Sequence, residues 1–389
     1  MIVIADDITG AAEMAGIAHQ HGLSVRLSIA GSLCCDRGAA ERTDVLVIAT
    51  DTRSMTEEEA VNETLRITSQ LSTLNSHLSP LTSHLFKKTD SALRGHVVAE
   101  LSALMQATSY QRAVYLPANP SKGRVIRNGC YYIKEVRGEK SEVREVPIHE
   151  TAFSYDPEFP AKTSVLKERF PDAETHHILM PDAETTADIQ YIVTANDDNH
   201  TLFAGAADLF ETYIEVRGER LEAKDLSESK NYPLTSHLSP LTSKSTLFLC
   251  GSTQSKPLDL GIPVTAMPMD IYDGSKDITS WLEEACAIYQ REGSLMITIP
   301  HRHRTGKEVA VHLRETTARL IQHLVERQQP RQLIIEGGAS TFATLRHLGW
   351  NELKVVSQLA PGVIKTKAPN GTFVIMKPGS YPWGSLFSC

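Results

Sequence analysis

The chain has 389 residues, 41% of them hydrophobic and 22% charged, which suits two domains and is ordinary for a globular protein. The formal net charge of −8 argues against a broad nucleic-acid-binding surface but leaves room for a small anion at a local basic site. No apolar run reaches membrane-spanning length, and the opening MIVIADD is not a signal peptide. The six cysteines contain no C-x-x-C pair. We therefore expect a protein of the reducing cytoplasm, with no membrane or nucleic-acid partner.

Short, β-rich apolar runs alternate with helical stretches along the chain. Because the runs are almost continuously apolar, we expect parallel strands that are covered on both faces. The alternation predicts an α/β fold with mainly parallel sheets. Strands are predicted, in chain order, at residues 1–5, 25–30, 44–50, 112–118, 246–251, 294–300 and 332–338. Helices are predicted at 10–22, 56–71 and 308–328, the second opened by a capping box of Thr56 and Glu59.

An eight-residue segment, SHLSPLTS, occurs at residues 76–83 and again at residues 236–243. Both copies belong to a seven-residue repeat that is too short for a solenoid and typical of an insertion tolerated in a loop. The second copy falls in a polar stretch rich in Ser, Thr and Pro. We therefore predict an N-terminal domain at 1–230, a linker or insertion at 231–245, and a C-terminal domain at 246–389.

Two acids, Asp6 and Asp7, end the first predicted strand and precede a helix opened by Gly and Ala. Ligands of open α/β sheets bind at the carboxyl ends of the strands. A helix cap accounts for one of the two acids and leaves the other for a functional role. A phosphatase with an Asp nucleophile in a D-x-D-x-T motif is excluded, because Ala5 occupies the nucleophile position.

Further loops of the first half combine acids with cations or hydroxyls. A carboxylate accepts hydrogen bonds from hydroxyls, and an Arg fork binds a carboxylate or a phosphate. This combination suits a small polyhydroxylated acid, although an ion pair with a helix cap is the alternative for the first of these loops. In chain order the loops contain Asp51, Arg53 and Ser54, then Lys87, Lys88, Asp90, Ser91 and Arg94, and then, in a Pro- and Gly-rich loop at 117–129, Lys122 and Arg124.

The second half carries glycine loops after strands, at residues 250–255, 335–345 and 360–384. Backbone N–H groups at a glycine-opened helix N-terminus can hold phosphate oxygens. The chain has no G-x-x-x-x-G-K-[ST] motif, which excludes a P-loop kinase. His301 and His303 follow a strand but have no acid or cysteine close by, so we assign no metal site.

Together these loops resemble the four-carbon acid sugar kinase family over nearly the whole chain. DDITGAAEMAG, DTRS, KKTDSALRGH and PANPSKGRVIRNG are similar, in order, to four motifs of the family's first half, and FSYDP (153–157) follows as expected. The second half is similar to the family's G-S, G-G-[DE]-[TS] and K-x-G elements. The chain departs from the pattern at Ala92, His96, Ala339 and Ser340, where the family usually has Thr, Asn, an acid and Thr.

The resemblance implies a sugar-acid-binding N-terminal α/β domain, a nucleotide-binding C-terminal α/β domain, and an active site in the cleft between them. It implies phosphoryl transfer from ATP, with Mg²⁺, to the terminal hydroxyl of threonate, erythronate or an oxo-tetronate. The substrate-binding residues would be Asp6, Asp51, Arg53, Lys88, Ser91 and Arg94. The ATP-binding residues would be Ser252, Gly337, Gly338, Ala339, Ser340, Gly379 and Gly384.

Under this interpretation Asp7 is the predicted base that orients or deprotonates the hydroxyl, and Asp90 is the alternate catalytic residue. Arg53 and Arg94 would bind the substrate's carboxylate, and Lys88 would offset phosphate charge. Two alternatives stay open: a non-catalytic sugar-acid-binding protein with a degenerate nucleotide site, and a metal-dependent hydrolase or aldolase that uses the paired acids and histidines. The expected partners are a small sugar acid and ATP, with a homodimer as the candidate assembly.

Overall fold

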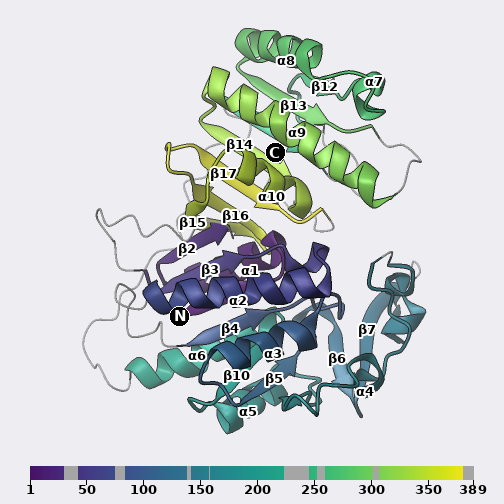
Figure 1. Ribbon diagram of the computed structural model, residues 1–389, viewed down its shortest axis with the longest axis vertical. Coiled ribbons are helices and arrows are strands. Elements are labelled where there is room, and N and C mark those ends of the chain that lie inside the picture. Colours follow the sequence, from purple (N-terminus) through teal and green to yellow (C-terminus); the bar gives the residue numbers. More distant parts are fainter. Residues whose placement is uncertain are drawn as a thin grey trace. The chain divides into compact units, whose positions relative to one another are not determined.

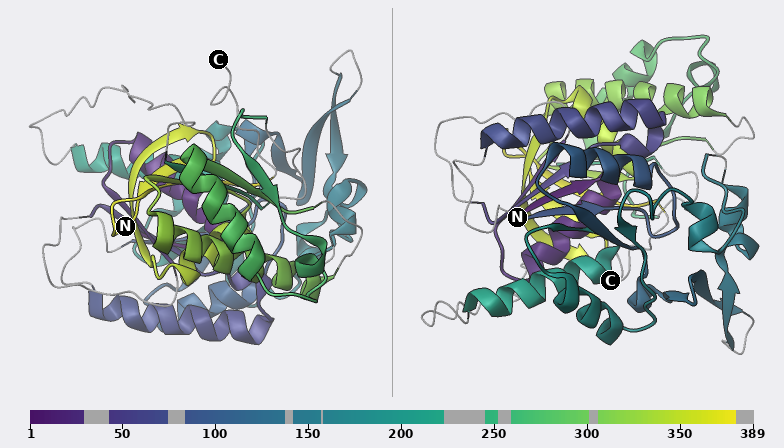
Figure 2. Two further views of the ribbon diagram at one scale, coloured as in Figure 1. Left: turned by 90° about the horizontal axis from the view of Figure 1, so that it is seen from above. Right: turned by 60° about the horizontal axis from the view of Figure 1, so that its bottom comes forward.

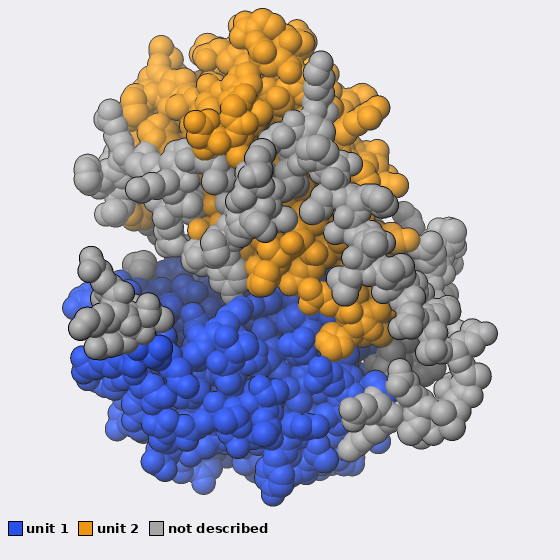
Figure 3. Space-filling model, turned by 180° about the vertical axis from the view of Figure 1, so that it is seen from behind, with its two compact units in different colours: residues 1–18, 35–231 blue, residues 19–34, 232–389 orange. Residues whose placement is uncertain are grey.

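The chain forms two compact units, coloured separately in Figure 3. The first unit comprises Met1–Ala18 and Cys35–Asn231, and the second comprises His19–Cys34 and Tyr232–Cys389. Residues 19–34, which the predicted boundaries assign to the first domain, thus belong to the second unit. The structure is a computed structural model (Figure 1) that describes residues 1–29, 43–74, 84–137, 142–156, 158–222, 245–251, 259–300 and 306–379. Both SHLSPLTS copies, residues 231–244 of the predicted linker, and His301 and His303 lie outside these ranges.

A parallel sheet in the order β3-β1-β4-β10-β5-β9 forms the centre of the first unit. Every residue of β1, β3 and β4 is buried, as expected for parallel strands covered on both faces. Ala5 at the end of β1 pairs with Ala49 of β3 and Lys88 of β4, so these three strands end level with one another. The bounds are β1 (Ile2–Ala5), β3 (Val45–Ala49), β4 (Leu85–Lys88), β5 (Arg112–Leu116), β9 (Ile178–Leu179) and β10 (Thr201–Gly205).

Helices cover both faces of this sheet (Figure 2). The alternation of side chains along β4 identifies the faces, because successive residues of a strand point to opposite sides. The Phe86 ring lies edge-on against Phe210 of α6, with centroids 5.0 Å apart, whereas Lys87 reaches Glu100 of α3. The helices of this unit are α1 (Ile8–Gln20), α2 (Glu57–Leu74), α3 (Val97–Ala107), α4 (Leu166–Arg169), α5 (Thr186–Asn196) and α6 (Ala207–Glu222).

The predicted capping box at the start of α2 is confirmed. Thr56 N–H donates to Glu59 Oε2 at 2.9 Å, and Glu59 N–H donates to Thr56 Oγ1 at 3.3 Å. Each side chain thereby satisfies a backbone donor that the first helical turn leaves without an intrahelical acceptor. The predicted helix at 56–71 is therefore correct, and it continues to Leu74.

The first unit also contains a small antiparallel sheet, part of which lies where the sequence predicts a loop. The sequence predicts a loop at residues 117–129, but only residues 117–123, which include the turn Pro120–Lys122, connect β5 to β6 (Arg124–Arg127). Strand β6 pairs with β7 (Cys130–Arg137). The hairpin turn is Asn128–Gly129, with φ of 50° and 71°. Asn-Gly is the preferred pair for such a turn, so it was the signal that the sequence analysis missed. Strand β8 (Glu142–Pro147) pairs with β7 and completes the sheet.

The strands of the second unit follow one another in the order β12-β13-β11-β14-β17-β16-β15-β2. The strands from β12 to β17 in this order are parallel, and the remaining pairs are antiparallel. Its strands are β2 (Val25–Ile29), β11 (Thr246–Cys250), β12 (Val264–Ala266), β13 (Ser294–Thr298), β14 (Gln332–Glu336), β15 (Glu352–Ala360), β16 (Val363–Lys367) and β17 (Phe373–Lys377). Its helices are α7 (Met269–Tyr272), α8 (Thr279–Glu292), α9 (Lys307–Gln328) and α10 (Gly338–His347).

The predicted α/β class with mainly parallel sheets is confirmed. Each predicted strand corresponds to a strand of the structure with slightly different ends: the runs at 1–5, 44–50 and 332–338, for example, contain β1, β3 and β14. The predicted strands leave out, among others, β10, β15, β16 and β17. Within the described part of the chain, none of the helices combines the length and apolarity needed to span a membrane.

Candidate active site

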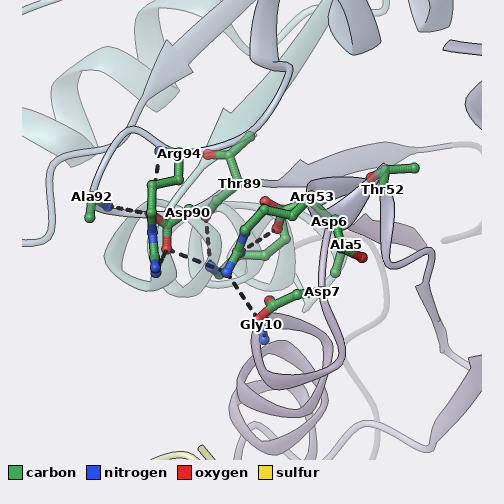
Figure 4. Close-up of polar contacts among 12 residues, drawn as sticks. Ala5, Asp6, Asp7, Gly10, Thr52, Arg53, Thr89, Asp90, Ala92 and Arg94 are labelled. Atoms are coloured by element: carbon green, nitrogen blue, oxygen red, sulfur yellow. Dashed lines mark hydrogen bonds and ion pairs between the residues drawn. The ribbon is translucent and has the colours of Figure 1, made fainter. Parts of the chain in front are cut away.

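Asp6 and Arg53 form the innermost ion pair of the candidate site. Asp6 follows directly after β1, and its side chain is 3% exposed; Arg53 lies in the turn η1 (Thr52–Ser54) that follows β3. The guanidinium donates two hydrogen bonds, from Nε to Oδ2 and from Nη2 to Oδ1, each 2.9 Å long (Figure 4). Two parallel charge-assisted bonds fix the orientation of both groups. Asp6 therefore holds Arg53 in place at the carboxyl end of the sheet.

Asp7 directly precedes α1 and also contacts Arg53. Its Oδ1 accepts the Gly10 N–H at 2.8 Å, which is the bond of a helix cap, and its Oδ2 accepts from the Thr9 hydroxyl and from Arg53 Nη1 at 3.1 Å. Of the two acids, Asp7 is therefore the one that caps the helix. Burial alone would raise the pKa of Asp7, but Arg53, Lys88 and the two hydrogen bonds lower it below its usual value.

Arg53 lies among three carboxylates. In addition to its two hydrogen bonds with Asp6, its Nη1 lies 3.1 Å from Asp7 Oδ2 and 3.7 Å from Asp90 Oδ1. Burial alone would lower the pKa of Arg53, but these three acids raise it well above its usual value, so the guanidinium stays protonated. We call Asp6, Asp7, Arg53, Asp90 and Arg94 the carboxylate–guanidinium cluster.

Asp90 and Arg94 form a second bidentate pair on the loop after β4. Arg94 donates from Nε to Asp90 Oδ2 at 2.8 Å and from Nη2 to Oδ1 at 3.0 Å, and Asp90 Oδ2 also accepts the Ala92 N–H at 3.0 Å. Burial opposes ionisation of Asp90, but Arg53 and Arg94 lower its pKa far below the usual value. Arg94 Nη1 also lies 3.4 Å from Asp156 Oδ2, a residue of the FSYDP motif for which the sequence analysis proposed no role.

Lys88, the last residue of β4, lies beside Asp7 on the α1 face of the sheet. Its Nζ donates to the Thr89 carbonyl at 2.7 Å and lies 3.8 Å from Glu13 of α1. Gly10 makes this position accessible: a Cβ at residue 10 would lie 2.8 Å from Asp7 Oδ1 and 3.3 Å from Lys88 Nζ. The lack of a side chain at Gly10 therefore lets the ammonium group approach the first turn of α1.

The predicted substrate-binding residues Asp51 and Ser91 lie close in the chain to Arg53 and Asp90, respectively. Asp51 directly precedes η1 with a left-handed backbone (φ 58°), and its side chain does not cap that turn. Ser91 follows Asp90; its Oγ accepts a hydrogen bond from Arg124 Nη1, and its carbonyl accepts one from the Tyr131 hydroxyl. The loop after β4 is thereby connected to the small β6–β7–β8 sheet.

A buried ion pair lies on the other face of the sheet from Lys88. Lys87 Nζ contacts Glu100 Oε2 of α3, and both side chains are at most 2% exposed. Glu100 Oε2 also accepts a hydrogen bond from Thr52 Oγ1 at 3.0 Å. Because Thr52 precedes Arg53 in the turn η1, this pair connects β4 and α3 to the segment that carries Arg53. Glu100 gave no distinctive signal in the sequence, since it lies within an ordinary helical stretch.

In the second unit, the predicted ATP-binding residues that the structure describes follow the carboxyl ends of β14 and β17. Gly337 has φ of 106° and directly precedes α10, and its N–H donates to the Lys377 carbonyl at 2.9 Å. The positive φ explains the need for glycine there. Next to this turn, at the last residues of β14 and β17, Lys377 Nζ lies 2.7 Å from Glu336 Oε1, and both side chains are 1% exposed. Gly338 is the first residue of α10, whose opening N–H groups have no intrahelical acceptor.

The other predicted ATP-binding residues differ in exposure. Ala339 is exposed, whereas Ser340 is buried beneath Gly251, where an added Cβ would lie 2.2 Å from Ser340 Oγ. Gly379 is the last residue that the structure describes in this unit. Ser252 and Gly384 lie outside the described residues.

Comparisons with known proteins agree with this organisation. Residues 1–176 match the model of a sugar-binding N-terminal domain, and residues 255–381 match that of a nucleotide-binding C-terminal domain. A D-threonate kinase of Salmonella typhimurium is 24% identical to this chain, over 96% of the chain and 91% of the relative. A 3-oxo-tetronate kinase of Actinobacillus succinogenes is 23% identical, over 97% of this chain and 96% of the relative.

A solved structure shows the same fold. The crystal structure of a Haemophilus influenzae protein of the DUF1537 family has a TM-score of 0.67 to this chain at 19% identity, and the match covers 100% of this chain and 98% of the other. At this identity the likeness shows the fold alone. The two domain models match in the order that the motifs predicted, and the named kinases align over nearly the full length. The chain therefore belongs to the four-carbon acid sugar kinase family.

Proposed function

We propose that this protein is an ATP-dependent kinase that phosphorylates the terminal hydroxyl of a four-carbon acid sugar: threonate, erythronate or an oxo-tetronate. The observation that carries the proposal is the carboxylate–guanidinium cluster, which lies at the carboxyl ends of β1, β3 and β4 in the unit that matches a sugar-binding domain. Carboxylates suit hydroxyl recognition, and fixed cations suit an anionic substrate. The kinases to which the chain is related support the same reaction class.

Asp7 is the carboxylate that best suits the reacting hydroxyl. Its side chain is the most exposed of the three, at 17% against 3% for Asp6 and 11% for Asp90, and its Oδ1 accepts a hydrogen bond from Gly10 alone. A carboxylate with a lowered pKa is a weak proton acceptor, so Asp7 orients the hydroxyl more than it removes its proton. A weakly basic carboxylate is sufficient for phosphoryl transfer, because stabilisation of its transition state depends mainly on positioning and charge neutralisation.

Lys88 is the cation proposed to offset the charge of the transferred phosphoryl group. It lies beside Asp7 across Gly10, and its pairing with Glu13 is long, at 3.8 Å. An ammonium group next to the attacking hydroxyl would stabilise charge that develops on the phosphoryl oxygens. Arg53 fixes the relative positions of the acids around it.

ATP is proposed to bind the second unit, with its phosphates at the N-terminus of α10. The N–H groups of Gly338 and its successors point out of the first helical turn, a position where anions bind. Mg²⁺ would arrive with ATP as part of the substrate. The buried acid nearest this turn, Glu336, is neutralised by Lys377, and residue 339 is alanine, so the described residues there offer the ion no open carboxylate.

A coupled assay of ADP release tests the proposal directly. The purified protein is given Mg·ATP with D-threonate, D-erythronate or an oxo-tetronate, and thermal-shift titrations with each ligand run in parallel. ADP release that depends on one of the acids supports the kinase. Stabilisation by an acid without ADP release would instead favour a binding protein, and acid turnover without ATP would favour a hydrolase or aldolase.

A further inference from the structure

Arg124 is the first residue of β6, and it reaches the loop that carries the cluster. Its Nη1 donates a hydrogen bond to Ser91 Oγ, and its guanidinium carbon lies 5.6 Å from the centre of the Phe153 ring. Arg94 lies 5.9 Å from the centre of the same ring. Arg124 is therefore close to the predicted substrate-binding residues Ser91 and Arg94, although it comes from a different sheet.

The backbone holds Arg124 in a fixed position. Gly123 precedes it with a left-handed φ of 67°, and Arg124 exchanges two backbone hydrogen bonds with Asn119, of 2.7 and 3.0 Å. Asn119 in turn accepts the Asp208 N–H at the start of α6 at 3.1 Å. With its guanidinium also packed near an aromatic ring, Arg124 loses little conformational freedom when it binds a ligand.

Arg124 differs from Arg53 and Arg94 in its charge pairing. Arg53 is bidentate with Asp6, and Arg94 is bidentate with Asp90. For Arg124, the described residues provide no carboxylate oxygen within 4.0 Å; its side-chain contacts are a serine hydroxyl and the ring of Phe153. Among the residues that the structure describes, Arg124 therefore has no ion-pair partner.

The charge of the cluster makes this difference important. Its three carboxylates are balanced by its two guanidinium groups and the neighbouring Lys88, so the cluster has no surplus of positive charge. A substrate carboxylate placed against Arg53 or Arg94 would compete with aspartates that already occupy their donors. A guanidinium without a carboxylate partner has donors available for a planar anion.

Resting on the proposed function, we infer that Arg124 binds the carboxylate of the sugar acid and makes the enzyme select acids over uncharged sugars. Ser91 orients the guanidinium, and Phe153 supports it from the side. Arg53 and Arg94, which the sequence analysis assigned to this carboxylate, then serve to hold the aspartates that face the hydroxyls.

Two ligands that differ only in charge test the inference: the acid that binds best to the wild type, and its amide. Calorimetry without nucleotide measures the affinity for each. Arg124→Met keeps much of the aliphatic stem over Phe153 but removes the charge. We expect it to weaken acid binding by about 10- to 100-fold, the range for a charge-assisted hydrogen bond, and amide binding by less than about threefold. Arg124→Lys, which keeps the charge without the fork, should recover part of the acid affinity.

Arg127→Met is the matched control. Arg127 lies on the same strand and also near an aromatic ring, 5.8 Å from the centre of Tyr132, but it pairs with Glu145 and Glu184. Its loss should leave the ratio of acid to amide affinity unchanged. Unchanged amide binding by Arg124→Met shows that the variant is folded.

The outcomes separate the inference from the proposed function. Retention of the wild-type preference for the acid in Arg124→Met would overturn the inference, as would failure of the wild type to bind any four-carbon acid. If the wild type binds an acid that Arg124→Met binds poorly, but neither releases ADP, the inference stands and the proposed kinase activity fails.

Discussion

Arg53 donates two hydrogen bonds of 2.9 Å to Asp6, and this pair joins the segments that follow β1 and β3. A buried ion pair is costly to break from one side, because the remaining charge has no partner. The pair also sets the position of Arg53 Nη1 relative to Asp7 and Asp90. Stability and the geometry of the proposed site are therefore coupled at Arg53.

Replacement of Arg53 by methionine should destabilise the fold by about 3–5 kcal/mol, because Asp6 would remain charged and buried. Urea unfolding followed by circular dichroism measures the loss. Arg66→Met is the matched control: Arg66 pairs with Glu63 on the surface of α2 and is 37% exposed, so its loss should cost less than about 1 kcal/mol. Equal losses for the two variants would show that burial does not determine the strength of the Asp6–Arg53 pair.

Asp7→Asn should lower the turnover rate by at least about 100-fold, since the amide cannot replace the carboxylate next to the hydroxyl. Its stability should fall by no more than about 2 kcal/mol, because asparagine caps a helix as well as aspartate does. Asp7→Ala should lose about 1 kcal/mol more, through the missing acceptor for Gly10. Steady-state kinetics and urea unfolding of both variants separate the two roles. Turnover near the wild-type rate in Asp7→Asn would remove Asp7 from the chemistry.

Glu100→Gln should destabilise the fold by about 3–5 kcal/mol, because Lys87 would remain charged and buried on the α3 face. The double variant Lys87→Met with Glu100→Leu removes both charges and should recover most of this loss. A double-mutant cycle of unfolding free energies gives the coupling between the two residues. Additive losses would contradict an interaction between them.

His84 gives the stability of the first unit a pH dependence. Burial, followed by the nearby Arg217, lowers the pKa of His84 from 6.5 to about 4. Between these values the unfolded chain binds a proton that the folded chain does not, so stability is lost as the pH falls from about 6.5 towards 4. His84→Gln should remove this contribution. The difference in unfolding free energy between wild type and variant, measured from pH 4 to 7, should vary with pH; a constant difference would contradict the assignment.

The sequence predicted where the site residues lie better than it predicted what they do. Strand ends follow from apolar runs, and the register Ala5–Ala49 and Ala5–Lys88 brings the loops after β1, β3 and β4 together. Which acid pairs with which arginine depends on side-chain geometry, and the local sequence pattern does not contain it. Two acids in a row suggested one cap and one ligand, but only the structure assigns the cap to Asp7.

Contacts from distant segments were beyond the sequence pattern. Lys87 and Lys88 look equivalent in the sequence, yet strand alternation directs one to Glu100 and the other towards Asp7 and Glu13. The cluster also includes contacts from Asp156, more than 60 residues along the chain from Arg94. Such pairings follow from the packing of whole elements, so they required the three-dimensional fold.

Identification of the reaction product tests the central claim most directly. The protein is incubated with Mg·ATP and the four-carbon acid that binds best, and the mixture is followed by ³¹P NMR with proton coupling. We predict a new phosphomonoester signal split by the two protons of a terminal CH₂ group, formed in step with ADP. Inorganic phosphate as the sole new product, or an ester coupled to a single proton, would contradict phosphorylation of the terminal hydroxyl.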